Sequence, residues 1–121
     1  YKEHLEMLPG INFLKEPKGY FSNRWLTTII LDSSLTGFEV SDLRELLLEE
    51  WIESRYLWKP MHLQPMYRSA PFYGGRIAEN LFSNGICLPS GTGLSNEELD
   101  RVIHIVFRLH KEVAWNAEKS V

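Results

Sequence analysis

The sequence has little of what marks several common classes of protein. Its 121 residues include a single cysteine, Cys87, so no disulfide can form within the chain, and a reducing, cytoplasmic location is expected. No apolar run approaches the ~20 residues that a membrane-spanning helix needs. With 13 Lys and Arg against 16 Asp and Glu, the chain has no basic excess to attract phosphate backbones. Neither a membrane nor nucleic acid is therefore expected as a partner.

The chain also lacks an initiator Met and any signal-peptide pattern at its start. Residues 1–8 instead resemble the end of a helix that Pro9 and Gly10 terminate. We therefore expect the sequence to be part of a longer chain, with a processed N-terminus as the alternative.

Apolar content and periodicity predict one folded domain. The chain is 44% hydrophobic with a formal net charge of −3, which argues against disorder. Strands are predicted at residues 11–14, 25–32, 53–59 and 86–89, the second as a central strand. Helices are predicted at 41–52, at 77–82 and from the capping box Ser95/Glu98 to about residue 113.

Details of the helices follow from the same pattern. Val40, Leu43, Leu47 and Trp51 form one apolar stripe, and Ser41 or Asp42 is expected to cap that helix. The pair 84–85 is expected to close the next helix with a left-handed residue, and residues 33–37 and 61–75 are expected to be turns and loops.

These elements predict an α+β fold, in which a small, mainly antiparallel sheet has helices packed on one side. The predicted domain covers residues 1–115. Residues 116–121 form a polar tail that is expected to fray.

The segment 53–67 combines Arg55, Lys59, His62 and several aromatic residues with prolines. Loops of this composition often line binding sites, because aromatic faces stack on rings and cations bind phosphate. The alternative is a surface loop whose aromatic residues cover the end of the core. Arg24 could bind an anion or form a salt bridge, and the four histidines show no metal-ligand spacing.

Several stretches resemble, in order, the C-terminal region of the DegT/DnrJ/StrS family. The most specific is Trp58-Lys59-Pro60-Met61-His62-Leu63-Gln64-Pro65. Others are Ser22-Asn23-Arg24-Trp25-Leu26, Ala78-Glu79-Asn80-Leu81-Phe82 and Gly85-Ile86-Cys87-Leu88-Pro89. The resemblance extends over residues 1–110.

The resemblance implies the small C-terminal domain of a fold-type I, pyridoxal-phosphate-dependent nucleotide-sugar aminotransferase. Such an enzyme would be a homodimer that moves an amino group, usually from glutamate, to a 4-keto nucleotide sugar for bacterial surface glycans. The lysine that holds the cofactor would lie upstream of residue 1. The chain alone should therefore be inactive and bind no cofactor.

The resemblance also suggests roles for individual residues. Trp58 to His62 would lie near the nucleotide sugar, with Lys59 on phosphate, Met61 and His62 on the sugar, and Tyr67 on a ring or phosphate edge. Arg24 and Arg55 are further candidates for anion contacts. A ligand-binding module and a non-catalytic sensor related to the family are the alternatives. Removal from a larger enzyme would expose an apolar face, so self-association of the chain is expected.

Overall fold

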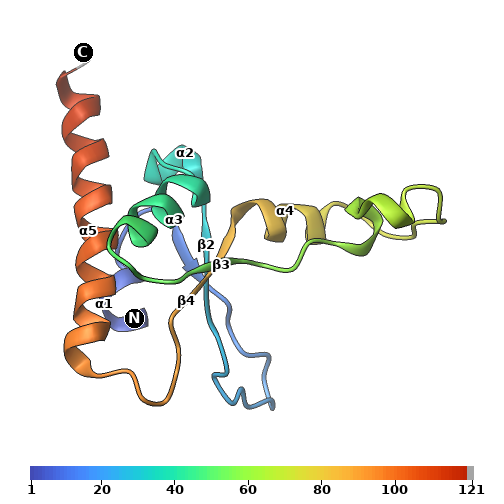
Figure 1. Cartoon of the computed structure of the whole chain (residues 1–121), viewed down its shortest axis with the longest axis horizontal. Coiled ribbons are helices and arrows are strands. Elements are labelled where there is room, and N and C mark those ends of the chain that lie inside the picture. Colours follow the sequence, from blue (N-terminus) through green and yellow to red (C-terminus); the bar gives the residue numbers. More distant parts are fainter. Residues whose placement is uncertain (120–121) are drawn as a thin grey trace.

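The computed structural model describes residues 1–119 and centres on one four-stranded sheet (Figure 1). The strands are β1 (Ile11–Phe13), β2 (Thr27–Leu31), β3 (Arg55–Tyr56) and β4 (Gly85–Leu88). Their order is β1-β2-β4-β3, and every neighbouring pair is antiparallel. Each strand overlaps a predicted one, β2 is an inner strand as expected, and the antiparallel α+β class is confirmed.

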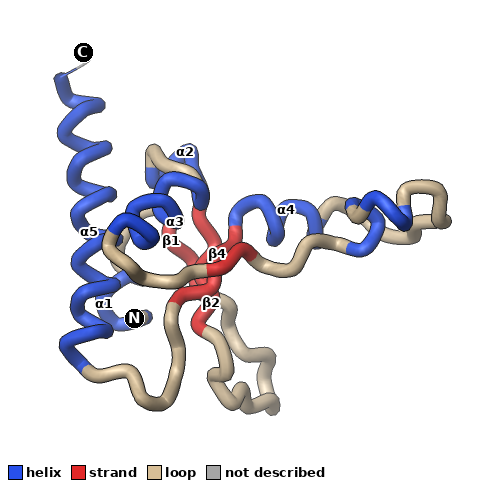
Figure 2. The backbone as a smooth tube through the Cα atoms, viewed as in Figure 1, coloured by secondary structure: helices blue, strands red, loops and turns tan. Residues whose placement is uncertain are grey.

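Three helices cover one face of this sheet: α1 (Lys2–Leu5), α3 (Val40–Glu49) and α5 (Asn96–Lys119) (Figures 1 and 2). Alternate strand residues point toward them. Ile29 and Leu31 of β2 and Ile86 of β4 are at most 3% exposed and form one buried cluster with side chains of the three helices. Each fully buried side chain of this kind contributes about 1.5–3 kcal/mol, so this cluster holds the helices to the sheet.

Helix α3 begins one residue before the predicted start and ends at Glu49 rather than residue 52. The N-cap is Glu39 rather than Ser41 or Asp42. Asp42, at the third helical position, accepts a hydrogen bond from the Glu39 N–H at 2.7 Å. At the other end Trp51 has a φ of 59°, and the Ile52 N–H donates to the Leu47 carbonyl. The prediction that Trp51 belongs to the apolar stripe is therefore wrong, because its left-handed backbone ends the helix and leaves the side chain 93% exposed.

Residues 33–37, expected to be a turn, contain the single-turn helix α2 (Ser33–Thr36). The Asp32 carboxylate accepts hydrogen bonds from the N–H and the hydroxyl of Ser34. Gly37 closes the turn with a φ of 74°. A four-residue helix spans only about one turn, so it has no repeating apolar pattern by which the sequence could reveal it.

Between β3 and β4 the chain forms an extended arm, residues 58–84, which projects from the sheet (Figure 1). It contains two 3₁₀ turns, η1 (Met61–Leu63) and η2 (Pro65–Tyr67), and the helix α4 (Ile77–Asn84). None of its residues is buried. Strand β3 is therefore much shorter than the predicted 53–59, because the chain leaves the sheet to enter the arm.

Gly85 does not form the left-handed cap expected after α4. Its φ of −107° is extended, and it is the first residue of β4. A Cβ at this position would collide with the Leu57 side chain and lie 2.5 Å from the Leu81 carbonyl oxygen. Glycine is therefore required here for close packing between the arm and the sheet.

The capping box that begins α5 is confirmed. The Ser95 N–H donates to Glu98 Oε2 at 2.8 Å, and the Glu98 N–H donates to Ser95 Oγ at 3.2 Å. The helix continues to Lys119, so the part of the predicted fraying tail up to that residue is helical. Residues 120–121 of that predicted tail lie outside the described residues.

Candidate functional site

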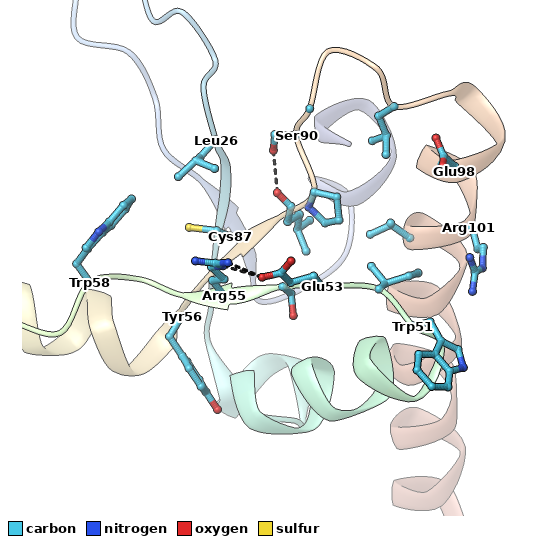
Figure 3. Close-up of a pocket in the computed structure, with 17 residues that line it drawn as sticks. Leu26, Trp51, Glu53, Arg55, Tyr56, Trp58, Cys87, Ser90, Glu98 and Arg101 are labelled. Atoms are coloured by element: carbon cyan, nitrogen blue, oxygen red, sulfur yellow. Dashed lines mark hydrogen bonds and ion pairs between the residues drawn. The ribbon is translucent and has the colours of Figure 1, made fainter.

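A cavity of about 660 Å3 lies where β3, the end of β4 and the first turns of α5 meet (Figure 3). Trp58 and Trp51 stand at its two ends. Two carboxylates and two guanidinium groups line it, from Glu53, Arg55, Glu98 and Arg101. These charges balance, and most of the remaining lining residues are apolar or aromatic.

The structure places two of the predicted site residues, Arg55 and Trp58, at this cavity. Arg55 donates from Nε and Nη2 to Glu53 Oε1 at 2.9 and 2.6 Å. Both side chains of this pair are more than 70% exposed, so the pair is worth little and Arg55 can exchange Glu53 for another anion. Trp58 is 67% exposed, with its ring centroid 6.3 Å from that of Trp25.

Residues near the turn after β4 shape the rest of the cavity. Ser90 Oγ accepts from the Thr27 N–H at 2.7 Å and donates to the Leu88 carbonyl at 2.8 Å. The buried Ser54 Oγ, which also belongs to a lining residue, has no hydrogen-bond partner in the described structure. In the first turn of α5, hydrogen bonds from its own backbone N–H and from Ser95 hold the pKa of Glu97 below its usual range.

Four further predicted residues, Lys59, Met61, His62 and Tyr67, lie in the arm and do not line this cavity. Lys59 is exposed and forms no ion pair with any of residues 1–119. Met61 is 58% exposed, and Tyr67 is partly exposed. The predicted site is thus divided between the cavity and the arm.

His62 is the best-fixed side chain of the arm. Its Nε2 lies 2.9 Å from Glu79 Oε1, and its ring is stacked on Phe72 with centroids 3.8 Å apart. Arg76 Nε lies 3.7 Å from the other oxygen of Glu79. His62, Phe72 and Glu79 come from η1, the segment between η2 and α4, and α4 itself, so tertiary structure alone brings them together.

Arg24, the remaining candidate, lies in the loop between β1 and β2. Its Nη2 donates to Glu16 Oε2 at 2.8 Å, and its φ is 55°. The salt bridge that the sequence left as an alternative is therefore formed. The loop still places Arg24 next to Trp25, which contacts Trp58.

Sequence reasoning missed Glu79, Phe72, Glu98 and Arg101 as site residues. Glu79 is 17 residues from His62, so no local spacing connects the two. Glu98 could have been found through its capping box, because the N-terminal turn of a helix is often placed at a site.

Few features of the described residues suit a pyridoxal phosphate site. Every lysine of the chain is exposed, and none lines the cavity; these are Lys2, Lys15, Lys18, Lys59, Lys111 and Lys119. A lysine that forms a Schiff base needs a desolvated pocket to lower its pKa. The residues present therefore do not fit the cofactor by themselves.

Two further features are absent from the part of the chain that the structure describes. Residues 1–119 contain no group of three or more His, Cys, Asp or Glu side chains placed to hold a metal ion. Among the same residues, no helix has the length and apolarity needed to cross a membrane.

The chain resembles known sugar aminotransferases in sequence and structure. Over 97% of its length it is 44% identical to EpsN of Bacillus subtilis (strain 168), provisionally named as a pyridoxal phosphate-dependent aminotransferase. It is 36% identical to the GDP-perosamine synthase of Escherichia coli O157:H7 over 82% of its length. The structure of DesV from S. venezuelae superposes with a TM-score of 0.73 over 90% of the chain, at 25% identity.

The chain spans only part of each relative: 31% of EpsN, 26% of the synthase and 29% of DesV. The model of the DegT/DnrJ/EryC1/StrS aminotransferase family matches residues 1–107, which include the sheet, the cavity and the arm. The chain belongs to the DegT/DnrJ/EryC1/StrS aminotransferase family.

Proposed function

We propose that this chain is the C-terminal part of a pyridoxal-phosphate-dependent enzyme that transfers an amino group from an amino acid, glutamate, to a 4-keto nucleotide sugar. The family match over residues 1–107 carries the proposal. A relative named GDP-perosamine synthase, 36% identical, supports a nucleotide-linked sugar as the acceptor. Surface-glycan synthesis in the bacterial cytoplasm is the setting we propose.

In this proposal the chain binds and orients the nucleotide sugar, while the rest of the enzyme holds the cofactor. Bound pyridoxal phosphate would supply the electron sink for amino transfer. The exposed lysines described above support a cofactor lysine elsewhere in the parent enzyme, so we expect the 121-residue chain alone to be inactive. We propose a homodimer for the parent enzyme and a domain covering residues 1–115, followed by the tail 116–121.

The proposed substrate contacts come from the cavity and the arm. Lys59 binds a phosphate, Met61 and His62 face the sugar, and Tyr67 contacts a ring or phosphate edge. The free ammonium group of Lys59 supports its role, because it has no competing carboxylate in the described structure. The remaining proposed contacts are Trp58 and Arg55 at the cavity and Arg24 beside it.

An absorption spectrum of the protein made from the complete reading frame tests the proposed reaction. With pyridoxal phosphate we expect a Schiff-base band that converts to the pyridoxamine form when glutamate is added. A protein that shows no such band would favour a ligand-binding module or a sensor related to the family.

The role of Lys59 is tested by Lys59→Ala in the same protein. Loss of one charge-assisted hydrogen bond should raise KM for the nucleotide sugar about tenfold or more, since such a bond is worth ~1.5–3 kcal/mol. Lys111→Ala, which removes an exposed lysine from α5, is the control and should leave KM unchanged. Equal KM values in the two variants would exclude a phosphate contact for Lys59.

A further inference from the structure

The arm lacks a core of its own, so its shape depends on a few side-chain contacts. None of residues 58–84 is buried. The His62–Glu79 contact joins the outgoing half of the arm to α4 on its returning half, across 17 residues. The side chains of His62 and Glu79 are only 17% and 28% exposed, which makes this pair the most shielded polar contact of the arm.

The chemistry of this contact determines where His62 carries its proton. An ionised carboxylate can only accept hydrogen bonds, so Nε2 must donate to Glu79. In a neutral imidazole the other nitrogen, Nδ1, is then an acceptor. The stacked Phe72, with centroids 3.8 Å apart and planes 28° from parallel, restrains the ring plane.

Nδ1 itself is free to bind a ligand. Within residues 1–119 it has no hydrogen-bond partner, and it is not one of the buried unpaired polar atoms. We propose that Glu79 is a positioning residue, which fixes His62 as the Nε2–H tautomer so that Nδ1 accepts a hydrogen bond from a hydroxyl or amino group of the sugar. This inference rests on the proposed function, and it assigns a donor group, rather than a phosphate, to His62.

Imidazole ¹⁵N NMR on the [¹⁵N]histidine-labelled chain tests whether Glu79 positions His62. The 121-residue chain is sufficient for this test, because His62, Phe72 and Glu79 all belong to it. The spectrum is recorded where the rings are neutral, and His62→Asn assigns the His62 signals. We expect the Nε2–H tautomer in the wild type and in Glu79→Gln, whose amide oxygen can still accept, but a mixture of tautomers in Glu79→Ala. Arg76→Ala is the matched control and should behave as the wild type. An unchanged tautomer in Glu79→Ala would overturn the proposal.

Steady-state kinetics of the complete protein, with a UDP-linked 4-keto-6-deoxy-hexosamine as the probe, test the consequence for the substrate. Glu79→Ala should raise KM about threefold to tenfold, the equivalent of one neutral hydrogen bond, with kcat changed less. Glu79→Gln should restore the wild-type KM, and Glu79→Ala should add nothing to His62→Ala. Additive effects would overturn the proposal. A wild type without amino transfer would instead count against the proposed function, and the tautomer would still decide the role of Glu79.

Discussion

At the scale of single residues, Trp51 holds the backbone in an unfavourable conformation. Its φ of 59° lies in the left-handed region, which is costly for a residue with a bulky side chain. The side chain, 93% exposed, has almost no packing to offset this cost. The position is one that helices usually give to glycine.

We expect Trp51→Gly to stabilise the chain by about 1 kcal/mol, because glycine adopts this conformation without a Cβ clash. Urea unfolding followed by circular dichroism measures the change. Trp51→Ala removes the same indole but keeps a Cβ, so it should not gain stability. If both variants were equally stabilised, backbone strain would not be the cause.

Tyr1 supplies a second prediction at this scale. Its hydroxyl donates to the Pro89 carbonyl at 3.0 Å, and burial raises the pKa of Tyr1 to about 12 from its ordinary 10.0. Between these two pH values the unfolded chain loses the Tyr1 proton first. The stabilisation of the folded chain by the protonated Tyr1 hydroxyl is therefore complete below pH 10 and disappears as the pH rises toward 12.

The free energy of unfolding should therefore fall between about pH 10 and pH 12 by about 1 kcal/mol more in the wild type than in Tyr1→Phe. This expected change in free energy is smaller than the pKa shift alone would imply, because the Tyr1 side chain is only half-buried and solvent screens the effect. Tyr73→Phe, which changes a side chain that is 91% exposed, should retain the wild-type slope. Identical slopes for all three proteins would contradict the assignment to Tyr1.

At the scale of elements, α3 is held by the face it turns to the core. Leu47 is fully buried, whereas its neighbour Leu48 is 60% exposed. A one-residue step along a helix rotates the side chain by about 100°, which separates the two environments. The two leucines therefore form a matched pair for mutation.

Leu47→Ala should destabilise the chain by about 2–5 kcal/mol, the cost of removing buried methyl groups and leaving a cavity. Leu48→Ala should change stability by less than about 0.5 kcal/mol. Chemical denaturation of both variants gives the comparison. A large effect at Leu48 would mean that α3 packs by another face.

At the scale of the whole molecule, the arm and the loop between β1 and β2 expose many large apolar side chains. Phe21 is 89% exposed, Trp25 70% and Trp58 67%, while Tyr73 and Ile77 exceed 70%. Figure 1 shows both segments extending away from α1, α3 and α5. Monomeric proteins rarely expose so much apolar surface without a partner for it.

We expect the chain to self-associate at high concentration, as the sequence predicted. Sedimentation velocity of Trp25→Ser/Trp58→Ser should show weaker association than the wild type. Trp115→Ser, which changes an exposed tryptophan of α5, should associate as the wild type does. A wild-type chain that stays strictly monomeric at high concentration would refute the prediction.

Much of the fold could be predicted because it depends on local patterns. The β-branched, apolar run in β2 predicts a strand, and the stripe of Val40, Leu43 and Leu47 records the side that α3 buries. The hydrogen bonds of Ser95 span only three residues. Each such signal lies within one element, so a single sequence is sufficient to recover it.

The candidate site was predictable only as a set of residue types. The run from Trp58 to His62 indicated a site, but Arg55 and Trp58 line the cavity while His62 lies in the arm. The pairing of His62 with Glu79 and the balanced charges around the cavity depend on segments far apart in the chain. Contacts between distant segments produce no regular spacing of residue types in the sequence.

The sequence by itself therefore determined the family, the approximate position of the four strands and of the longer helices, and the apolar stripe of α3 as far as Leu47. Tertiary structure alone decided where α3 stops, why residue 85 must be glycine and which group fixes His62. The physical reason is the range of the interactions. Periodicity and capping act over a few residues, whereas steric exclusion and side-chain hydrogen bonds depend on which distant segments meet in space.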